Sequence, residues 1–301
     1  MKAGRALLGK PAVAPIDVTK VMNVRPSYWR VFVTFLRNSL VRELMFPVNF
    51  VIESISSIGW VAMNLALYIL IFNYTNYLGS NAEGAGAWDK YQFFVFLATS
   101  LLINNIVQMF FMPNAEEFSE LIRSGSLDFA LLKPIDTQFL ISLQKADWSA
   151  VSNLLIGVVL LAYSLPRLDG FTPSVWAFVL YPIYIVLGVL VMYSIMIALA
   201  ATSVWLGRNQ SLYDFWFYIT NFARYPLEIY NGPIGGWLRW TLTFLVPVLV
   251  VVNVPARLLA KPFQREYAYL AVFAILATAV SLWASRWVFQ RALLSYRSAS
   301  S

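Results

Sequence analysis

The 301-residue chain has no cysteine and no histidine, and charged residues make up only 12% of it. Without cysteine there is no disulfide framework and no thiolate nucleophile. Without histidine the chain lacks the side chain most used as a general base and metal ligand. A Ser-His-Asp triad, a Cys-His dyad and a zinc site are therefore excluded, which argues against most hydrolytic enzymes. We predict no catalytic residue and no metal site.

Apolar residues are abundant instead. They make up 59% of the chain, and aromatic residues 16%, including 11 Trp. Soluble domains are about 45–50% apolar and about 25% charged, and Trp and Tyr favour the headgroup level of a bilayer. The composition predicts an integral membrane protein in contact with membrane lipid, and its long apolar runs predict that it is all-α.

The net charge of +7 is unevenly distributed along the chain. Eight of the 22 Lys and Arg residues precede the first long apolar run: Lys2, Arg5, Lys10, Lys20, Arg25, Arg30, Arg37 and Arg42. Such an excess beside the first span places the N-terminus in the cytoplasm. The basic charge is therefore interpreted as a membrane-topology signal, and we predict no nucleic-acid partner.

The N-terminal region divides into two parts. Residues 1–26 are predicted to form a basic cytoplasmic tail. Residues 27–46 follow a helical period in which polar side chains share one arc: Ser27, Arg30, Thr34, Arg37 and Asn38. This pattern is typical of an amphipathic helix in the membrane interface. The alternative is a first span that begins early.

Charge-free windows long enough to cross a bilayer lie at 54–82, 91–115, 148–166, 170–207 and 267–285. The region 208–266 is ambiguous. Its first part, 211–230, carries Asp214, Arg224 and Glu228, and its second, 240–256, is short and contains two prolines. Charge counting leaves open which part crosses, and a re-entrant hairpin over 232–260 is physically allowed where protein surrounds it.

A short charged helix is predicted after the second apolar window. Pro113 stops the preceding span, Asn114 is a candidate N-cap, and Glu117 completes a capping-box-like pattern. Glu116 and Glu120 also favour the N-terminal end of a helix dipole. Arg123 favours the C-terminal end, and Gly125 is a left-handed stop.

Phe118, Leu121 and Ile122 form an apolar stripe on this short helix. A helix of about ten residues is marginal alone in water, so the stripe is expected to be held by a partner surface. The alternative is a solvated connector.

Two stretches carry a resemblance to a known family. "LIRSGSLDFALLKPID" resembles the cytoplasmic loop after the second span in membrane subunits of ABC-2 type exporters, in particular a bacterial subgroup with the pattern R-x-G-x-L-D-x-x-L-L-K-P. The matching residues are Arg123, Gly125, Leu127, Asp128, Leu131, Leu132, Lys133 and Pro134. "YPLEIYNGPIGGWLRWTLTFLVPVLVVVNVPARLLAKP" is similar to the subgroup's segment before its last span. The resemblance runs from about residue 25 to the C-terminus.

The resemblance implies a fold. A six-span domain would occupy 47–301, with a re-entrant helical hairpin at 232–260 and both termini in the cytoplasm of a bacterial inner membrane. The expected spans are about 48–72, 91–112, 138–165, 174–206, 211–230 and 267–289.

The resemblance also implies a function: the permease subunit of an ATP-driven exporter, itself without bond chemistry. Residues 114–124 would be a coupling helix that docks on a separate ATPase subunit. The expected coupling residues are Glu116, Glu117, Phe118, Glu120, Leu121, Ile122 and Arg123. Two ATPase subunits would hold ATP and Mg, and a second copy or a related permease would complete the pathway.

A G-x-x-x-x-G-K pattern at 4–10 is followed by Pro11 instead of Ser or Thr, so the nucleotide site is expected on another chain.

Carboxylates within spans are functional candidates because burying them is costly. Asp214, near Arg208, is the best candidate for an interior polar site, in a structural pair or in contact with substrate or ion. An ion-coupled secondary carrier or channel that uses Asp214 and Glu53 is the alternative function, and a structural membrane anchor is another. The substrate is not indicated by the sequence.

Overall fold

The computed structural model describes residues 27–79, 86–168, 174–206, 210–262 and 265–296. These residues form helices and one isolated bridge, between Leu78 and Trp88, and no strand. Five helical stretches are long and apolar enough to cross a membrane: Pro47–Tyr74, Lys90–Arg123, Trp148–Arg167, Val175–Leu206 and Tyr267–Ser295. The prediction of an all-α membrane protein is confirmed. The predicted tail at 1–26 and the pattern at 4–10 lie outside the described residues.

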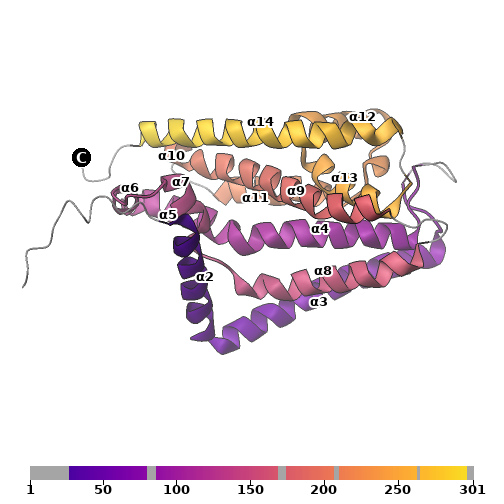
Figure 1. The fold of residues 1–301 in the computed structure, drawn as a ribbon, viewed down its shortest axis with the longest axis horizontal. Coiled ribbons are helices and arrows are strands. Elements are labelled where there is room, and N and C mark those ends of the chain that lie inside the picture. The colour runs from indigo at the N-terminus through magenta and orange to yellow at the C-terminus, as the bar shows by residue number, and fades with distance from the viewer. Residues whose placement is uncertain (1–26, 80–85, 169–173, 207–209, 263–264, 297–301) are drawn as a thin grey trace, which may run out of the picture.

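The long helices form a bundle with two distinct ends (Figure 1). They are α3 (Pro47–Tyr74), α4 (Lys90–Phe110), α8 (Val151–Ser164), α9 (Val175–Ala201) and α14 (Arg265–Ser295). At one end lie α2 (Tyr28–Leu44), α5 (Met112–Arg123), α6 (Leu127–Leu131), α7 (Thr137–Leu143) and α10 (Ser203–Leu206). We call this the α5 end, and the opposite end the Trp88 end.

Helix α2 lies across the α5 end, at a steep angle to the long helices (Figure 1). The polar residues predicted to face water on it, from Ser27 to Asn38, are all exposed. This arrangement agrees with an interfacial helix and leaves α3 as the first candidate span.

Little of α3 is buried within the protein. Its exposed apolar side chains suit contact with lipid.

Between α10 and the bent pair described below, the chain runs from the α5 end to the Trp88 end through a short helix. The chain leaves α10 at the α5 end, forms α11 (Gln210–Phe222) and η3 (Leu227–Ile229), and reaches the Trp88 end at Glu228, which accepts a hydrogen bond from Trp88 Nε1. Thirteen residues of helix cover about 20 Å, less than the roughly 30 Å of hydrocarbon. Residues Ala223, Leu227 and Glu228 beyond it are buried, where non-helical backbone is tolerated at membrane depth.

The segment predicted to be re-entrant forms a bent pair of helices. Gly232–Leu245, which comprises α12 (Gly232–Trp240) and η4 (Thr241–Leu245), meets α13 (Val248–Ala260) at 87°. Glu228 before the pair contacts Trp88, and Lys261 after it donates to the carbonyls of Gly86 and Ala87. Both ends of the pair therefore lie at the Trp88 end, as a re-entrant segment requires.

The span predicted at 138–165 is interrupted. The structure has α7, then an irregular segment, then η1 (Trp148–Ala150), α8 and η2 (Leu165–Arg167). Four consecutive N–H groups in the interruption donate to other helices: Lys145 to Asn114 Oδ1 (2.8 Å), Ala146 to Ser39 Oγ (3.1 Å), Asp147 to the Met109 carbonyl (2.8 Å) and Trp148 to Glu43 Oε1 (2.9 Å). We call residues 145–148 the junction. Acceptors on α2, α4 and α5 thus replace the carbonyl groups that a continuous helix would supply. The periodicity of the sequence does not predict these distant acceptors, so the interruption was not predicted.

Helices α9 and α13 approach closely at the centre of the bundle. A Cβ added to Gly188 would lie 2.8 Å from Val251 Cγ1 and 3.1 Å from the Val251 carbonyl oxygen. Small residues permit such contacts between membrane helices.

We expect Gly188→Ala to lower the free energy of unfolding by about 1–3 kcal/mol, because the new methyl group meets backbone as well as side chain. Gly59→Ala is the matched control, since nothing lies within 4 Å of a Cβ there. This control should raise stability by about 0.5–1 kcal/mol through helix propensity. Unfolding in detergent measures the stability of both variants. A Gly188→Ala variant as stable as the wild type would contradict the close packing of Gly188 against Val251.

Candidate functional site

Helix α5 is anchored differently from the sequence prediction. It begins at Met112, and no side chain caps it. Asn114 is buried and bonds to Lys145 with both side-chain atoms, accepting from its N–H and donating to its carbonyl. Glu117 forms an ion pair with the Lys145 ammonium. The predicted capping box is therefore wrong: both of its residues fix α5 to the junction instead. The predicted stop is confirmed, since Gly125 has φ 71°.

Phe118 faces the inside of the protein. Its side chain is fully buried and packs on Phe289 of α14, with ring centroids 5.7 Å apart. The expectation that the stripe faces a partner is thus wrong for Phe118, because α14 already covers it. Leu121 and Ile122 are half-buried against the same core.

The outer surface of the α5 end mixes charge with exposed apolar groups. On α5, Glu116, Glu120 and Arg123 are exposed, and Glu120 pairs with Arg123. Beyond the half-buried Asp128, Phe129 is 73% exposed and Leu132 is 81% exposed. Lys133 and Pro134 follow them at the surface. The resemblance predicted this loop motif, but not that Phe129 and Leu132 point outward.

A polar network ties α7 to α14 and α9. Arg286 of α14 donates to both carboxylate oxygens of Asp136 and to Gln138 Oε1. Gln138 in turn donates to the Tyr193 hydroxyl on α9. The hydrogen bonds from Arg286 hold the pKa of the Asp136 carboxyl below its usual range, so this pair stays charged at neutral pH. The loop motif is thereby joined to the last span.

Comparison with protein families matches residues 58–300 to the model of the ABC-2 family transporter protein. The chain belongs to the ABC-2 transporter family. The resemblance is confirmed at family level, and the chain is a membrane transport component of a family whose members generally work with ATPase partners. Comparisons with curated proteins and with solved structures found no match.

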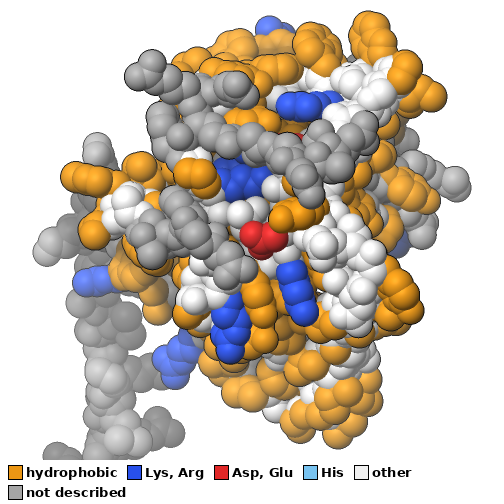
Figure 2. Space-filling view, turned by 90° about the vertical axis from the view of Figure 1, so that its right-hand side faces the viewer, with side chains coloured by type: hydrophobic (Ala, Val, Ile, Leu, Met, Phe, Trp, Pro, Cys, Tyr) orange, Lys and Arg blue, Asp and Glu red, His pale blue; other side chains and the backbone are white. Residues whose placement is uncertain are grey.

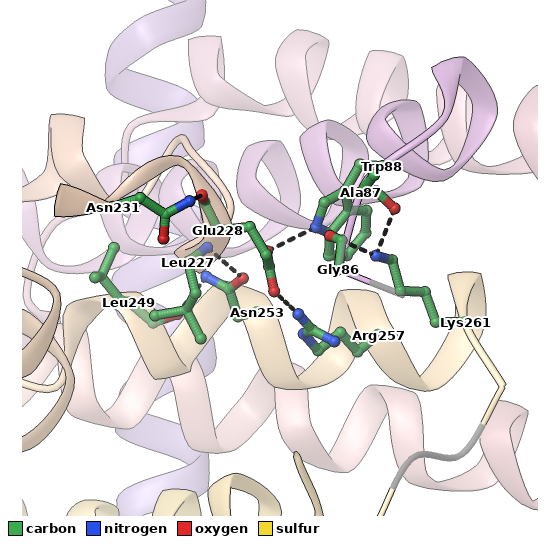
Figure 3. A network of polar contacts seen from close by, with 10 residues as sticks. All are labelled: Gly86, Ala87, Trp88, Leu227, Glu228, Asn231, Leu249, Asn253, Arg257 and Lys261. Carbon is green, nitrogen blue, oxygen red and sulfur yellow. Dashed lines mark hydrogen bonds and ion pairs between the residues drawn. The ribbon is translucent and has the colours of Figure 1, made fainter. Parts of the chain in front are cut away.

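At the Trp88 end, this ABC-2 protein holds a buried charged cluster: Trp88, Glu228, Asn253, Arg257 and Lys261 (Figure 3). Glu228 is 4% exposed and forms an ion pair with Arg257, which is 9% exposed. Trp88 Nε1 donates to Glu228 Oε2 at 2.8 Å, and Asn253 Oδ1 accepts from the N–H of Leu227. Figure 2 shows Lys and Arg side chains near the middle of this end, within a hydrophobic rim.

Sequence reasoning recognised Glu228 as an intramembrane acid but missed its partner. Asn253, Arg257 and Lys261 are spaced four residues apart, so they lie along one face of α13. That spacing is the signal that could have indicated a polar face. Because the sequence analysis did not single out Arg257 or Lys261, the cluster was not predicted.

The predicted acidic candidates Glu53 and Asp214, and Asp147 of the junction, have separate environments. Asp147 accepts from the N–H and hydroxyl of Ser149 and caps η1. Glu53 is exposed in the second turn of α3. The side chain of Asp214 and all of Arg208 lie outside the described residues, so the predicted polar site at Asp214 stays a prediction. The described residues contain no group of His, Cys, Asp or Glu that could hold a metal ion.

We expect Glu228→Gln to lower the free energy of unfolding by about 3–5 kcal/mol, because Arg257 would remain charged and buried without its partner. Adding Arg257→Met should restore much of the loss. Glu120→Gln, which breaks an exposed pair, is the control and should cost less than about 1 kcal/mol. The free energy of unfolding of the purified variants tests this prediction. Equal losses of stability for Glu228→Gln and the control would contradict a buried ion pair between Glu228 and Arg257.

The stability should also depend on pH through Lys261. Burial and the neighbouring charge of Arg257 lower the pKa of Lys261 from 10.5 to about 7, against the opposing effect of Asp89. Between these pH values the unfolded chain binds more protons than the native one, so raising the pH stabilises the protein. Relative to Lys261→Met, the wild type should gain up to about 1.4 kcal/mol per pH unit from pH 7 to 9. A constant difference in unfolding free energy over this range refutes the shift.

Proposed function

We propose that this ABC-2 protein is the permease subunit of an ATP-driven exporter in a bacterial inner membrane, with the α5 end in the cytoplasm. Two such subunits, identical or related, form the pathway, and two separate ATPase subunits bind ATP and Mg. The observation that carries the proposal is the surface of α5 and α6, whose exposed side chains are joined to the bundle by a connected set of contacts.

This surface has the chemistry of a protein interface. Phe129 of α6 and Leu132 directly after it are exposed apolar side chains, and α6 lies at the tip of the bundle (Figure 1). Glu116, Glu120 and Arg123 are exposed on α5, the preceding helix. Interfaces place apolar and aromatic groups at the centre and charged groups at the rim. We therefore assign docking to Phe129 and Leu132, and charge complementarity to the α5 side chains.

The contacts behind this surface provide a route for coupling. Helix α5 is held to the junction by Asn114 and Glu117, and to α14 by Phe118. Helix α7 is held to α14 by Asp136 and Arg286. When ATP binding draws the ATPase subunits together, α5, α6 and α7 would move as one body and shift α14 against α9. A bistable bundle converts such a shift into inward and outward openings.

An ion-coupled carrier or channel is the alternative. It would use Asp214 or Glu53, and it would transport without an ATPase. The two hypotheses differ in one measurable property, because only the exporter loses transport when the ATPase partner is removed.

The test is co-purification with the ATPase encoded beside this chain. We expect Phe129→Asp with Leu132→Asp to reduce co-elution at least about tenfold, since interface anchors typically contribute 2 kcal/mol or more. Both side chains are exposed, so the variant should fold. Tyr74→Asp, at an 87% exposed position near the Trp88 end, is the matched control and should retain the ATPase.

Undiminished co-elution of the double variant would refute the docking surface. A wild-type chain that is stable in detergent and retains no ATPase would refute the exporter assignment and favour the carrier.

A further inference from the structure

A cavity of about 500 Å³ lies between the first turns of α9 and α14 and the last turns of α13. Its volume falls within the roughly 300–1,000 Å³ typical of small-molecule sites. The lining is mainly apolar or aromatic, and its polar members are few: Ser174, Tyr184, Arg257, Lys261 and Tyr267. The cavity extends along α9 from Ser174 to Tyr184. These ten residue steps correspond to a length of about 15 Å at the rise of a helix.

The cavity lies at the level where headgroups are expected. Trp176 and Tyr267 line it from the starts of α9 and α14, and such aromatic side chains favour the membrane–water boundary. Trp176 is 73% exposed, and Leu180, one turn deeper, is 37% exposed. The cavity is therefore accessible from the lipid-facing surface of two spans.

Two cations in the lining have unused hydrogen-bonding capacity. Lys261 donates to the carbonyls of Gly86 and Ala87 at 3.0 and 2.8 Å and lies over the Trp88 ring, 4.3 Å from its centroid. Among the described residues, two of its three N–H groups therefore have a hydrogen-bond acceptor. Arg257 pairs with Glu228 and stacks over Tyr267, yet its buried Nε has no hydrogen-bond partner among the described residues. Glu228, the carboxylate that pairs with Arg257, is shared with Trp88.

We infer that this cavity binds an anionic phospholipid from the surrounding membrane, with its phosphate at Lys261 and Arg257 and an acyl chain along α9 toward Tyr184. The apolar walls exclude a small soluble anion as the full occupant. Arg257, together with Lys261 in its protonated form, favours an anionic headgroup over a zwitterionic one. This inference is independent of the ATPase proposed above, because it concerns the opposite end of the bundle.

The test uses the full chain in nanodiscs that contain equal amounts of phosphatidylglycerol and phosphatidylcholine. Native mass spectrometry after release into detergent counts the lipids that stay bound. We expect selective retention of phosphatidylglycerol. Lys261→Met should lower that retention about fivefold, as expected for one cation near a lipid headgroup. Lys90→Met, which removes a cation at the start of α4 outside the cavity, should change nothing.

A second variant separates lipid binding from the integrity of the charged cluster. Ala268→Phe fills the apolar part of the cavity while Arg257 and Lys261 are kept, and it should abolish retention. Equal retention of both lipids by the wild type would overturn the inference, as would unchanged retention in both variants. Displacement of the bound signal by inorganic phosphate alone would overturn it in favour of a soluble anion.

Discussion

The junction at residues 145–148 is the contact on which the α5 end depends. Its four consecutive N–H groups donate to α2, α4 and α5, whereas in a continuous helix each would be satisfied within the same segment. An unsatisfied backbone group buried in the protein costs about 1–3 kcal/mol, so the acceptors on three helices must be in place together. Helices α2 and α5 and the start of α8 are thereby fixed relative to one another.

The opposite end is fixed by charge. Glu228 before the bent pair of helices and Lys261 after it both contact residues 86–88. Glu228 also pairs with Arg257 of α13, so moving the bent pair away from the Trp88 end would separate buried charges. The pair of Asp136 and Arg286 at the α5 end is about one-third to two-fifths exposed. Exposed pairs contribute little to stability, so this second pair serves mainly to set geometry, and it is better suited to an element that moves.

Helix α14 connects the two ends. Its first turns line the lipid-facing cavity and place Tyr267 under Arg257, and its last turns carry Arg286 and Phe289 against α7 and α5. A helix of 31 residues is about 46 Å long. It contains no proline, so it lacks the commonest cause of a kink. A displacement at one end is therefore carried to the other, which gives an occupant of the cavity a physical route to influence the α5 end.

The sequence by itself determined the membrane class, most of the long helices and the amphipathic pattern of α2, because these follow from hydropathy and helical period. The bounds of the bent pair came from the resemblance to ABC-2 membrane subunits, since charge counting left that region open. The sequence also located the loop motif and the left-handed stop at Gly125. Tertiary structure alone decided the break at the junction, the inward direction of Phe118, the outward direction of Phe129 and the partner of Glu228. In each of these cases the deciding group lies on a helix distant in sequence, and a local pattern does not specify which buried donor meets which acceptor.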